Sequence, residues 1–213
     1  DPYNDPIVEM LNADDNFEVT VIQLGAGDTT DLGGYDVVVA QETFGSGDAV
    51  WMPGKVLGLA SIEVPFVYNK VYALRENKAF ASGTAGGVAE VADSPYLVVD
   101  PANQSHALFT GMTFTDDKIM IVGETAADDG GVGTKSLQYG TDQVISGDNT
   151  LLGYQEGAEG NVTIGVNYVP AGSTIGSETT KADAVLICQN YGSIIRNWGN
   201  NLTSEGLTLW RNA

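Results

Sequence analysis

The hydrophobic pattern of this chain is clearest in residues 34–70. Two runs there, residues 37–40 and 64–68, are apolar without polar alternation, which is typical of strands buried on both faces of a parallel sheet. Residues 48–61 lie between the runs and carry apolar positions that predict a helix, although two glycines interrupt it. A strand, a helix and a second strand in this order predict a parallel α/β unit.

The chain before this unit predicts two more elements. Residues 1–13 are expected to form a loop and a short helix, in which Asp5 is the N-cap and Pro6 takes the first helical position. Residues 18–24 predict a strand. Because a parallel unit normally has a strand before such a helix, we expect either a first strand upstream of Asp1 or a sheet that is one strand short.

Residues 96–100 and 118–123 predict two further strands, and after them the pattern changes. Glycine becomes frequent, and short apolar runs alternate with turn signals, which favours antiparallel strands. The last residues, 201–213, predict a helix capped by Asn201 or Thr203. The expected strands of this later part are residues 143–146, 150–154, 161–169 and 182–189.

The charge of the chain excludes two classes of partner. Its 213 residues, a length that suits one α/β domain, contain 9 Lys and Arg against 28 Asp and Glu, a formal net charge of -19. Such a chain would repel nucleic acid, whose binding depends on basic groups that neutralise phosphates, and it would repel an anionic membrane surface. The acidity is explained by solubility, especially in a salty medium, or by cation binding, and composition leaves both open.

Cysteine content and hydropathy exclude further features. The one cysteine, Cys188, allows no internal disulfide, and it lies in an apolar run where a free cysteine acts as a small buried hydrophobe. No apolar run approaches the roughly eighteen residues of a membrane span, so we expect no membrane insertion.

Polar side chains follow both strands of the central unit. Gln41, Glu42, Thr43 and Ser46 come after the first strand, and Asn69, Lys70 and Tyr72 come after the second. In open α/β sheets ligands bind beyond the carboxyl ends of the strands, so these residues are the expected ligand-binding set. Carboxylates, amides and hydroxyls suit a carbohydrate, and Trp51, Tyr68 and Tyr72 would add stacking faces unless they belong to the core.

Three residues are candidates for catalysis. Lys70, at the end of a buried strand, would act as a nucleophile or base if burial lowered its pKa, with Glu42 as its partner. The alternative is an ion pair between Lys70 and Glu42 or Asp36. His106 would act as a general base, with Asp100 as its partner, or serve a structural role in its turn.

Metal and cofactor motifs are absent from the sequence. No His or Cys cluster predicts zinc, and no glycine-rich motif predicts a nucleotide. Calcium stays open in so acidic a chain, although the acidic pairs do not follow the spacing of a calcium loop. These pairs are Asp28 with Asp31, Asp116 with Asp117, and Asp128 with Asp129.

The order of the elements resembles a known family. The segments GYDVVV, VPFVYNK, NQSHALFTGM and NWGNNLTSEGLTLWRNA follow one another as in the class I glutamine-amidotransferase-like superfamily. They are most similar to trehalose-utilisation-type domains of secreted, multidomain bacterial proteins related to carbohydrates. HALFTGM resembles the family's His-Pro-Leu-x-x-Gly-Leu turn. The resemblance implies an α/β flavodoxin-like three-layer sandwich, with a mainly parallel sheet and a partly antiparallel C-terminal extension, in one domain over residues 1–213.

The family's catalytic residues are absent from the matching positions. Its enzymes carry a nucleophilic cysteine after the strand that matches residues 64–68, where this chain has Asn69 and Lys70. They carry His-Pro-Glu after a late strand, where this chain has Gln189-Asn190-Tyr191. Without a nucleophile and a base, acyl transfer of that kind has no mechanism.

These observations lead to one hypothesis and two alternatives. The first is a non-catalytic binding or structural module of an extracytoplasmic or secreted bacterial protein, associated with carbohydrate and joined to other domains of a longer chain. The second is a hydrolase or isomerase of a sugar derivative, with Glu42 and Lys70 as its acid and base. The third is a subunit of a surface or filament assembly.

Overall fold

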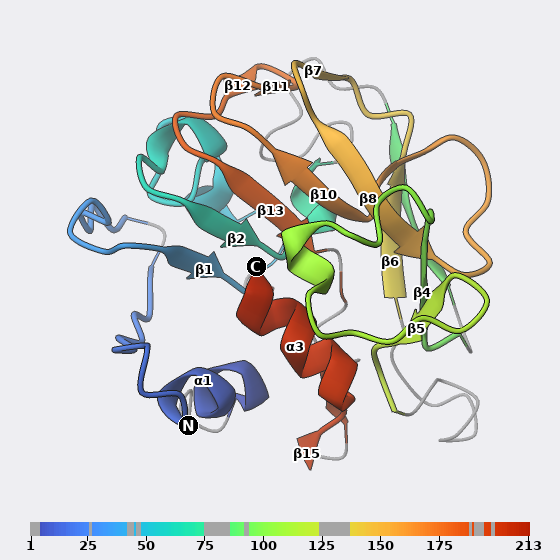
Figure 1. The fold of residues 1–213 in the computed structure, drawn as a ribbon. Coiled ribbons are helices and arrows are strands. Elements are labelled where there is room, and N and C mark those ends of the chain that lie inside the picture. Colours follow the sequence, from blue (N-terminus) through green and yellow to red (C-terminus); the bar gives the residue numbers. More distant parts are fainter. Residues whose placement is uncertain are drawn as a thin grey trace.

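The computed structural model of the chain is built mainly from β-strands (Figure 1). It describes residues 5–25, 27–41, 45, 48–74, 86–91, 94–123, 137–187, 189, 194–196 and 199–213. Among these residues the main sheet has seven strands, and the smaller sheets have two or three strands each. The α-helices among the described residues are α1 (Pro6–Asn12) and α3 (Ser204–Asn212).

The remaining elements are short. The strands are β1 (Val38–Ala40), β2 (Phe66–Tyr68), β3 (Gly87–Val91), β4 (Tyr96–Val99), β5 (Lys118–Met120), β6 (Leu137–Thr141), β7 (Ile145–Ser146), β8 (Thr150–Gln155), β9 (Val162–Ile164), β10 (Val166–Val169), β11 (Thr174–Ile175), β12 (Glu178–Thr179), β13 (Ala184–Ile187), β14 (Ile195–Arg196) and β15 (Gly199–Asn200). The 3-10 turns are η2 (Ala49–Trp51), η3 (Leu59–Ser61), η4 (Val71–Leu74) and η5 (Ala107–Phe109).

The strands of the main sheet lie in the order β1-β2-β13-β10-β8-β4-β5. β2 is parallel to both of its neighbours, so that Val67 lies opposite Val39 on one side and Val185 on the other. The four other pairings in this sheet are antiparallel. The carboxyl ends of β1, β2 and β13 therefore meet at one edge, and three successive reversals place the carboxyl end of β4 at the opposite edge.

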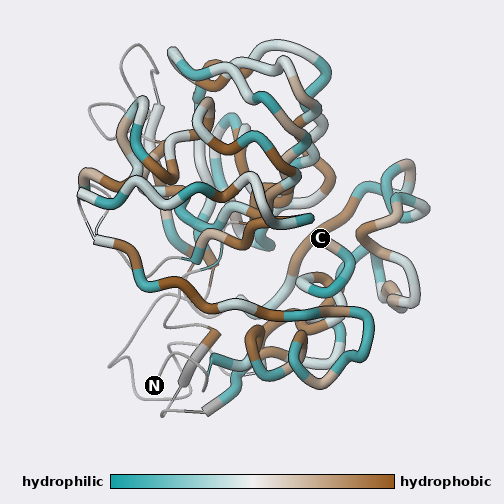
Figure 2. Tube along the Cα trace, turned by 90° about the vertical axis from the view of Figure 1, so that its left-hand side faces the viewer, coloured by the Kyte–Doolittle hydropathy of each residue, from teal (hydrophilic) through white to brown (hydrophobic). Residues whose placement is uncertain are grey.

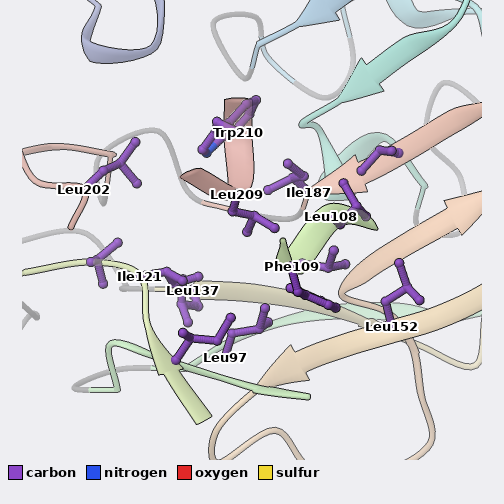
Figure 3. Close-up of a cluster of buried hydrophobic side chains, with 14 of the residues drawn as sticks. Leu97, Leu108, Phe109, Ile121, Leu137, Leu152, Ile187, Leu202, Leu209 and Trp210 are labelled. Carbon is purple, nitrogen blue, oxygen red and sulfur yellow. The ribbon is translucent and has the colours of Figure 1, made fainter. Parts of the chain in front are cut away.

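β2 and β13 are buried on both faces, as their uninterrupted apolar runs predict. Along β2, Phe66 and Tyr68 belong to one cluster of buried side chains, and Val67 belongs to the other. The 3-10 turns η2, η3 and η4 cover the first cluster. Helices α1 and α3 and the turn η5 cover the second, which Figure 3 shows with Leu209 and Trp210 of α3 above the sheet residues.

The expected flavodoxin-like three-layer sandwich is wrong, because one of its two helical layers is missing. Residues 48–61 form η2, η3 and turns in place of a helix. Pro53 interrupts the segment, and Gly54 has a φ of 73°, which a helix does not accept. A side chain at Gly58 would come within 2.7 Å of the carbonyl oxygen of Met52. Irregular turns therefore cover this face.

The expected mainly parallel sheet is also wrong. The later strands β8, β10 and β13 are not an extension of a parallel sheet, because they lie in the same sheet as β1 and β2. Residues 18–24, expected as a strand, run extended but form no strand. Figure 2 shows this stretch along one side of the molecule, with its hydrophobic positions in brown.

Both predicted terminal helices are confirmed. Asp5 caps α1 by accepting a hydrogen bond from the backbone N–H of Ile7 at 2.8 Å, and Pro6 is the first helical residue. Thr203, one of the two expected caps, accepts from the N–H of Gly206 at 3.0 Å at the start of α3. In the described part of the chain no helix is long and apolar enough to cross a membrane.

An ion pair joins the last strands of the main sheet. Lys118 on β5 donates to Glu156, which follows β8, at 2.5 Å, and Ser94 donates to the same carboxylate at 3.1 Å. These hydrogen bonds hold the pKa of Glu156 below its usual value. Hydrogen bonding to Glu156 raises the pKa of Lys118. Because both side chains are more than one-third exposed, solvent screens much of this attraction.

We expect Gly206→Ala to destabilise the protein by about 1–3 kcal/mol, although alanine usually stabilises a helix. A Cβ atom at this position would lie 2.2 Å from the carbonyl oxygen of Ile121, so α3 would have to move off the sheet. The control is Gly34→Ala, where a Cβ atom meets nothing within 4 Å. Chemical denaturation of both variants checks this, and equal stability of the two would contradict the close approach of α3.

We expect Glu156→Gln to lower the free energy of unfolding at pH 7 by up to about 1 kcal/mol. Because the folded pKa of Glu156 is lowered, its contribution is present above the unfolded pKa and is lost as the pH falls through the folded value. The difference from the parent should therefore shrink below the ordinary pKa of 4.5. The control is Glu63→Gln, which removes a more exposed ion pair with Lys181. In denaturation experiments at pH 7 to 3, the free energy of unfolding of this variant should stay close to that of the parent.

Candidate functional site

Three parallel strands end in amide side chains at the same edge of the main sheet. Asn69, directly after β2, donates through Nδ2 to Oε1 of Gln41, directly after β1, at 3.1 Å. Its Oδ1 accepts from the backbone N–H of Gln189, two residues after β13, at 2.9 Å. One asparagine therefore ties together the ends of three strands. We call Gln41, Asn69, Gln189 and Trp210 the amide chain.

Trp210 of α3 completes the amide chain. Its indole Nε1 donates to Oε1 of Gln189 at 2.9 Å, and both residues are almost fully buried. Figure 1 shows that the C-terminal end of α3 reaches this edge of the sheet. The helix is amphipathic, and its apolar residues Leu209 and Trp210 pack into the core cluster that α3 covers.

Two amide nitrogens in the amide chain have no hydrogen-bond partner. These atoms are Nε2 of Gln41 and Nε2 of Gln189, and both are buried from solvent. Leaving such a donor unpaired costs on the order of 1–3 kcal/mol. The carboxyl ends of these strands therefore keep two N–H donors without an acceptor.

The expected binding residues of the second strand lie beside the amide chain. Lys70 is buried, with 6% of its surface exposed, and Tyr72 lies half-buried in η4. Trp51 and Tyr68 are core residues whose rings meet edge to face at 5.3 Å, so they offer no stacking face to a sugar. Of the three aromatic candidates, Tyr72 alone keeps partial exposure.

Part of the expected site lies outside the described residues. These positions are Glu42, Thr43 and Ser46, and Cys188 is another. The structure therefore brings together Gln41, Asn69 and Lys70 of the predicted set. The expected pairing of Glu42 with Lys70 stays a prediction.

The structure separates His106 from these residues. His106 follows β4, whose carboxyl end lies at the opposite edge of the sheet from those of β1 and β2. Its Nδ1 accepts from the N–H of Leu108 at 3.3 Å at the start of η5, and its ring lies 5.7 Å from that of Tyr168. Its expected partner Asp100 accepts from the N–H of Ala102. This arrangement fits the structural role for His106.

Tyr168, whose ring lies beside that of His106, is hydrogen-bonded to Asp183. Its hydroxyl donates to Asp183 at 2.8 Å, and the N–H of Ala171 donates to the same carboxylate at 2.9 Å. The Ala171 N–H and the Tyr168 hydroxyl hold the pKa of Asp183 below its usual value, and Asp183 raises the pKa of Tyr168. The two groups fix the loop before β13 and leave no free base there.

A polar cleft lies among the loops that precede β1 and β2. Its volume is about 420 Å³, and its polar lining includes Asp28, Thr30, Asp31, Lys55 and Glu63. Sequence reasoning missed this cleft, because acidic residues in loops are usually solvated. The carboxylate of Asp31 already accepts from the N–H of Gly33 at 2.8 Å.

No group of three or more possible metal ligands gathers within the residues that the structure describes. In comparisons with known proteins, the chain matches no protein-family model, no curated protein and no solved structure. The proposal for its function therefore rests on its own residues.

The sequence anticipated part of this edge and missed the rest. Polar residues after two apolar runs were sufficient to place Gln41, Asn69 and Lys70. The role of Gln189 depends on β13 lying next to β2, which the sequence does not show. Trp210 reads as one more apolar residue of a helix, and its indole N–H carries no sequence signal for a partner 21 residues away.

We expect Asn69→Ala to lower the free energy of unfolding by about 2–3 kcal/mol, because it leaves the buried N–H of Gln189 without an acceptor. Gln41→Ala should cost less than about 1 kcal/mol, since Gln41 is half-buried and the change also removes its own unpaired Nε2 donor. Urea denaturation measures both. An Asn69→Ala variant as stable as Gln41→Ala would show that the amide chain does not hold the strand ends together.

Proposed function

We infer that this protein is a non-catalytic binding module, and that it holds a neutral carbohydrate at the carboxyl edge of β1, β2 and β13. The observation that carries this proposal is the pair of buried, unpartnered Nε2 atoms of Gln41 and Gln189. Two fixed N–H donors suit the hydroxyl oxygens of a sugar. A binding role is favoured over catalysis because the described residues of this edge include amides and one lysine but no nucleophile paired with a base.

The charge of the protein supports a neutral ligand. A net charge of -19 raises an electrostatic barrier against anionic sugars and phosphates before they reach any local donor. Lys70 is nearly buried at this edge, so it offers little exposed charge to offset that barrier. An extracytoplasmic location and attachment to further domains belong to the same proposal.

The polar cleft at the amino edge is the competing location. Its carboxylates and hydroxyls also suit a sugar, but no buried donor points to a missing acceptor there. Lys55 lines this cleft and Gln41 does not. Variants at these two positions therefore separate the two locations.

The test is a thermal-shift screen of the purified protein with neutral and acidic oligosaccharides. A neutral saccharide at one hundred times its dissociation constant should add about 2.7 kcal/mol, which is about 5–10 °C in Tm. Gln41→Glu should abolish the shift, since it keeps the acceptor for Asn69 but replaces the Nε2 donor with oxygen. Gln23→Glu adds the same charge at an exposed position and should keep the shift, as should Lys55→Ala.

Other outcomes point elsewhere. A shift that Lys55→Ala removes would place the sugar in the polar cleft and contradict the carboxyl-edge site. Turnover of a sugar derivative that Lys70→Ala abolishes would favour the hydrolase or isomerase alternative. A flat panel with a particle size that grows with concentration would favour the assembly subunit.

A further inference from the structure

An apolar cleft of about 560 Å³ borders the main sheet at β1. One wall is β1 with its flanking residues, 37–41, and the opposite wall is the extended stretch of residues 17–24. We call this cleft the edge slot. It lies apart from the amide chain except at Gln41, which belongs to both.

Within the described residues, the backbone that faces the edge slot from either wall has no sheet partner. Val38 donates to Pro65, and Ala40 accepts from Asn69, so these two residues turn their backbone groups toward β2. Because peptide groups alternate along a strand, those of Val39 face the slot. Among the described residues, none forms a backbone hydrogen bond with residues 18–24 on the opposite wall.

The side chains of β1 are those of an interior strand. Natural edge strands usually carry charged residues or proline that prevent further pairing. Here Val37 is 40% exposed, and Phe17 on the opposite wall is 36% exposed. The apolar run of residues 37–40 predicts burial on both faces, and only Ala40 reaches it.

The dimensions of the edge slot fit one strand. Ile7 and Leu11 of α1 line the slot. Leu32 and Leu57 also line it, and both belong to the core cluster on the opposite face of the sheet from α1. A strand residue in a covered sheet fills about 160 Å³, given roughly 3.3 Å of rise, 4.8 Å between strands and 10 Å between layers. The slot volume therefore holds about three to four strand residues, close to the length of β1.

We propose that the edge slot is the seat of one more β-strand, parallel to β1 and supplied by the same polypeptide ahead of α1. Asp5, the N-cap of α1, itself lines the slot, so the start of α1 lies beside the place of the proposed strand. α1 covers the slot, and the chain then returns as residues 17–24 on its far side. Strand, α1 and residues 17–24 would form one right-handed crossover unit.

The proposal explains two discrepancies at once. Residues 18–24 read as a strand but have no ladder, because their neighbour is the missing strand. The valines of β1 read as interior but lie at an edge for the same reason. The seated strand must be uncharged and apolar on both faces, since α1 covers one face and Leu32 and Leu57 the other.

The test compares two extensions fused directly before Asp1. The first is the probe strand Thr-Val-Val-Ile-Val-Thr-Val followed by a Gly-Asn turn, and the second replaces alternate valines and isoleucine by proline, which cannot donate to a ladder. We expect the probe strand alone to raise Tm by more than about 5 °C and to slow amide exchange at Val39 more than tenfold. Equal Tm and exchange for the two extensions would overturn the proposal.

A cysteine pair provides a second measurement that does not depend on the design of the probe. The variant carries Ile22→Cys and Val38→Cys in a Cys188→Ser background. If a strand lies between these two positions, they are about two strand spacings apart, or about 10 Å. A disulfide requires Cα atoms less than about 7 Å apart. We expect the probe strand to prevent the cross-link that the proline extension allows. Rapid cross-linking with both extensions would mean that residues 17–24 pair with β1 directly. Amide exchange at Val39 that slows as the protein concentration rises would mean that a second copy fills the slot. Either outcome overturns the proposal, and neither depends on carbohydrate binding.

Discussion

The structure depends on the burial of β2 on both faces and at both edges. Its backbone pairs with β1 and β13, and its side chains enter both core clusters. Phe66 and Tyr68 need a cover on one side, and Val67 needs one on the other. This constraint decides where α1, α3 and the 3-10 turns must lie. Because no side chain of β2 is free for a ligand, polar chemistry is confined to the residues that follow the strand.

The amide chain holds the ends of three strands together, and it is also the place of the proposed binding site. Asn69 satisfies one donor and one acceptor of its neighbours, and Trp210 brings α3 into the same network. Amides suit this place, because each can donate and accept hydrogen bonds without the desolvation cost of an ionised group. The arrangement leaves two Nε2 donors unused. A binding module that holds a hydroxyl-rich ligand needs little more than such fixed donors.

β1 lies at the edge of the main sheet and is paired only with β2 among the described strands. A parallel sheet is stable only where both faces are covered, and covered strands lose the charged residues that protect an edge. β1 has the composition of a covered strand and has one paired edge. The edge slot lies beside this edge, and no backbone hydrogen bond joins β1 to residues 18–24 in the described part of the chain.

The sequence by itself determined many local elements and the place of the polar residues that form the candidate site. The apolar runs fixed β1, β2 and β13 to within a few residues, the caps Asp5 and Thr203 fixed both helices, and polar residues after the runs pointed to Gln41 and Asn69. These features depend on neighbouring residues alone, so short-range pattern is sufficient for them.

Tertiary structure alone decided the rest. Pro53 and Gly54 break the helix expected over residues 48–61, but only the folded structure shows that the resulting turns pack Gly58 against the carbonyl oxygen of Met52. Which strands pair, and in which direction, is set by the burial that each pairing achieves, and β2 pairs with β13 although β2 ends at Tyr68 and β13 begins at Ala184. For this reason Gln189 lies beside Asn69 although 120 positions separate them, and His106 lies at the opposite edge from Lys70.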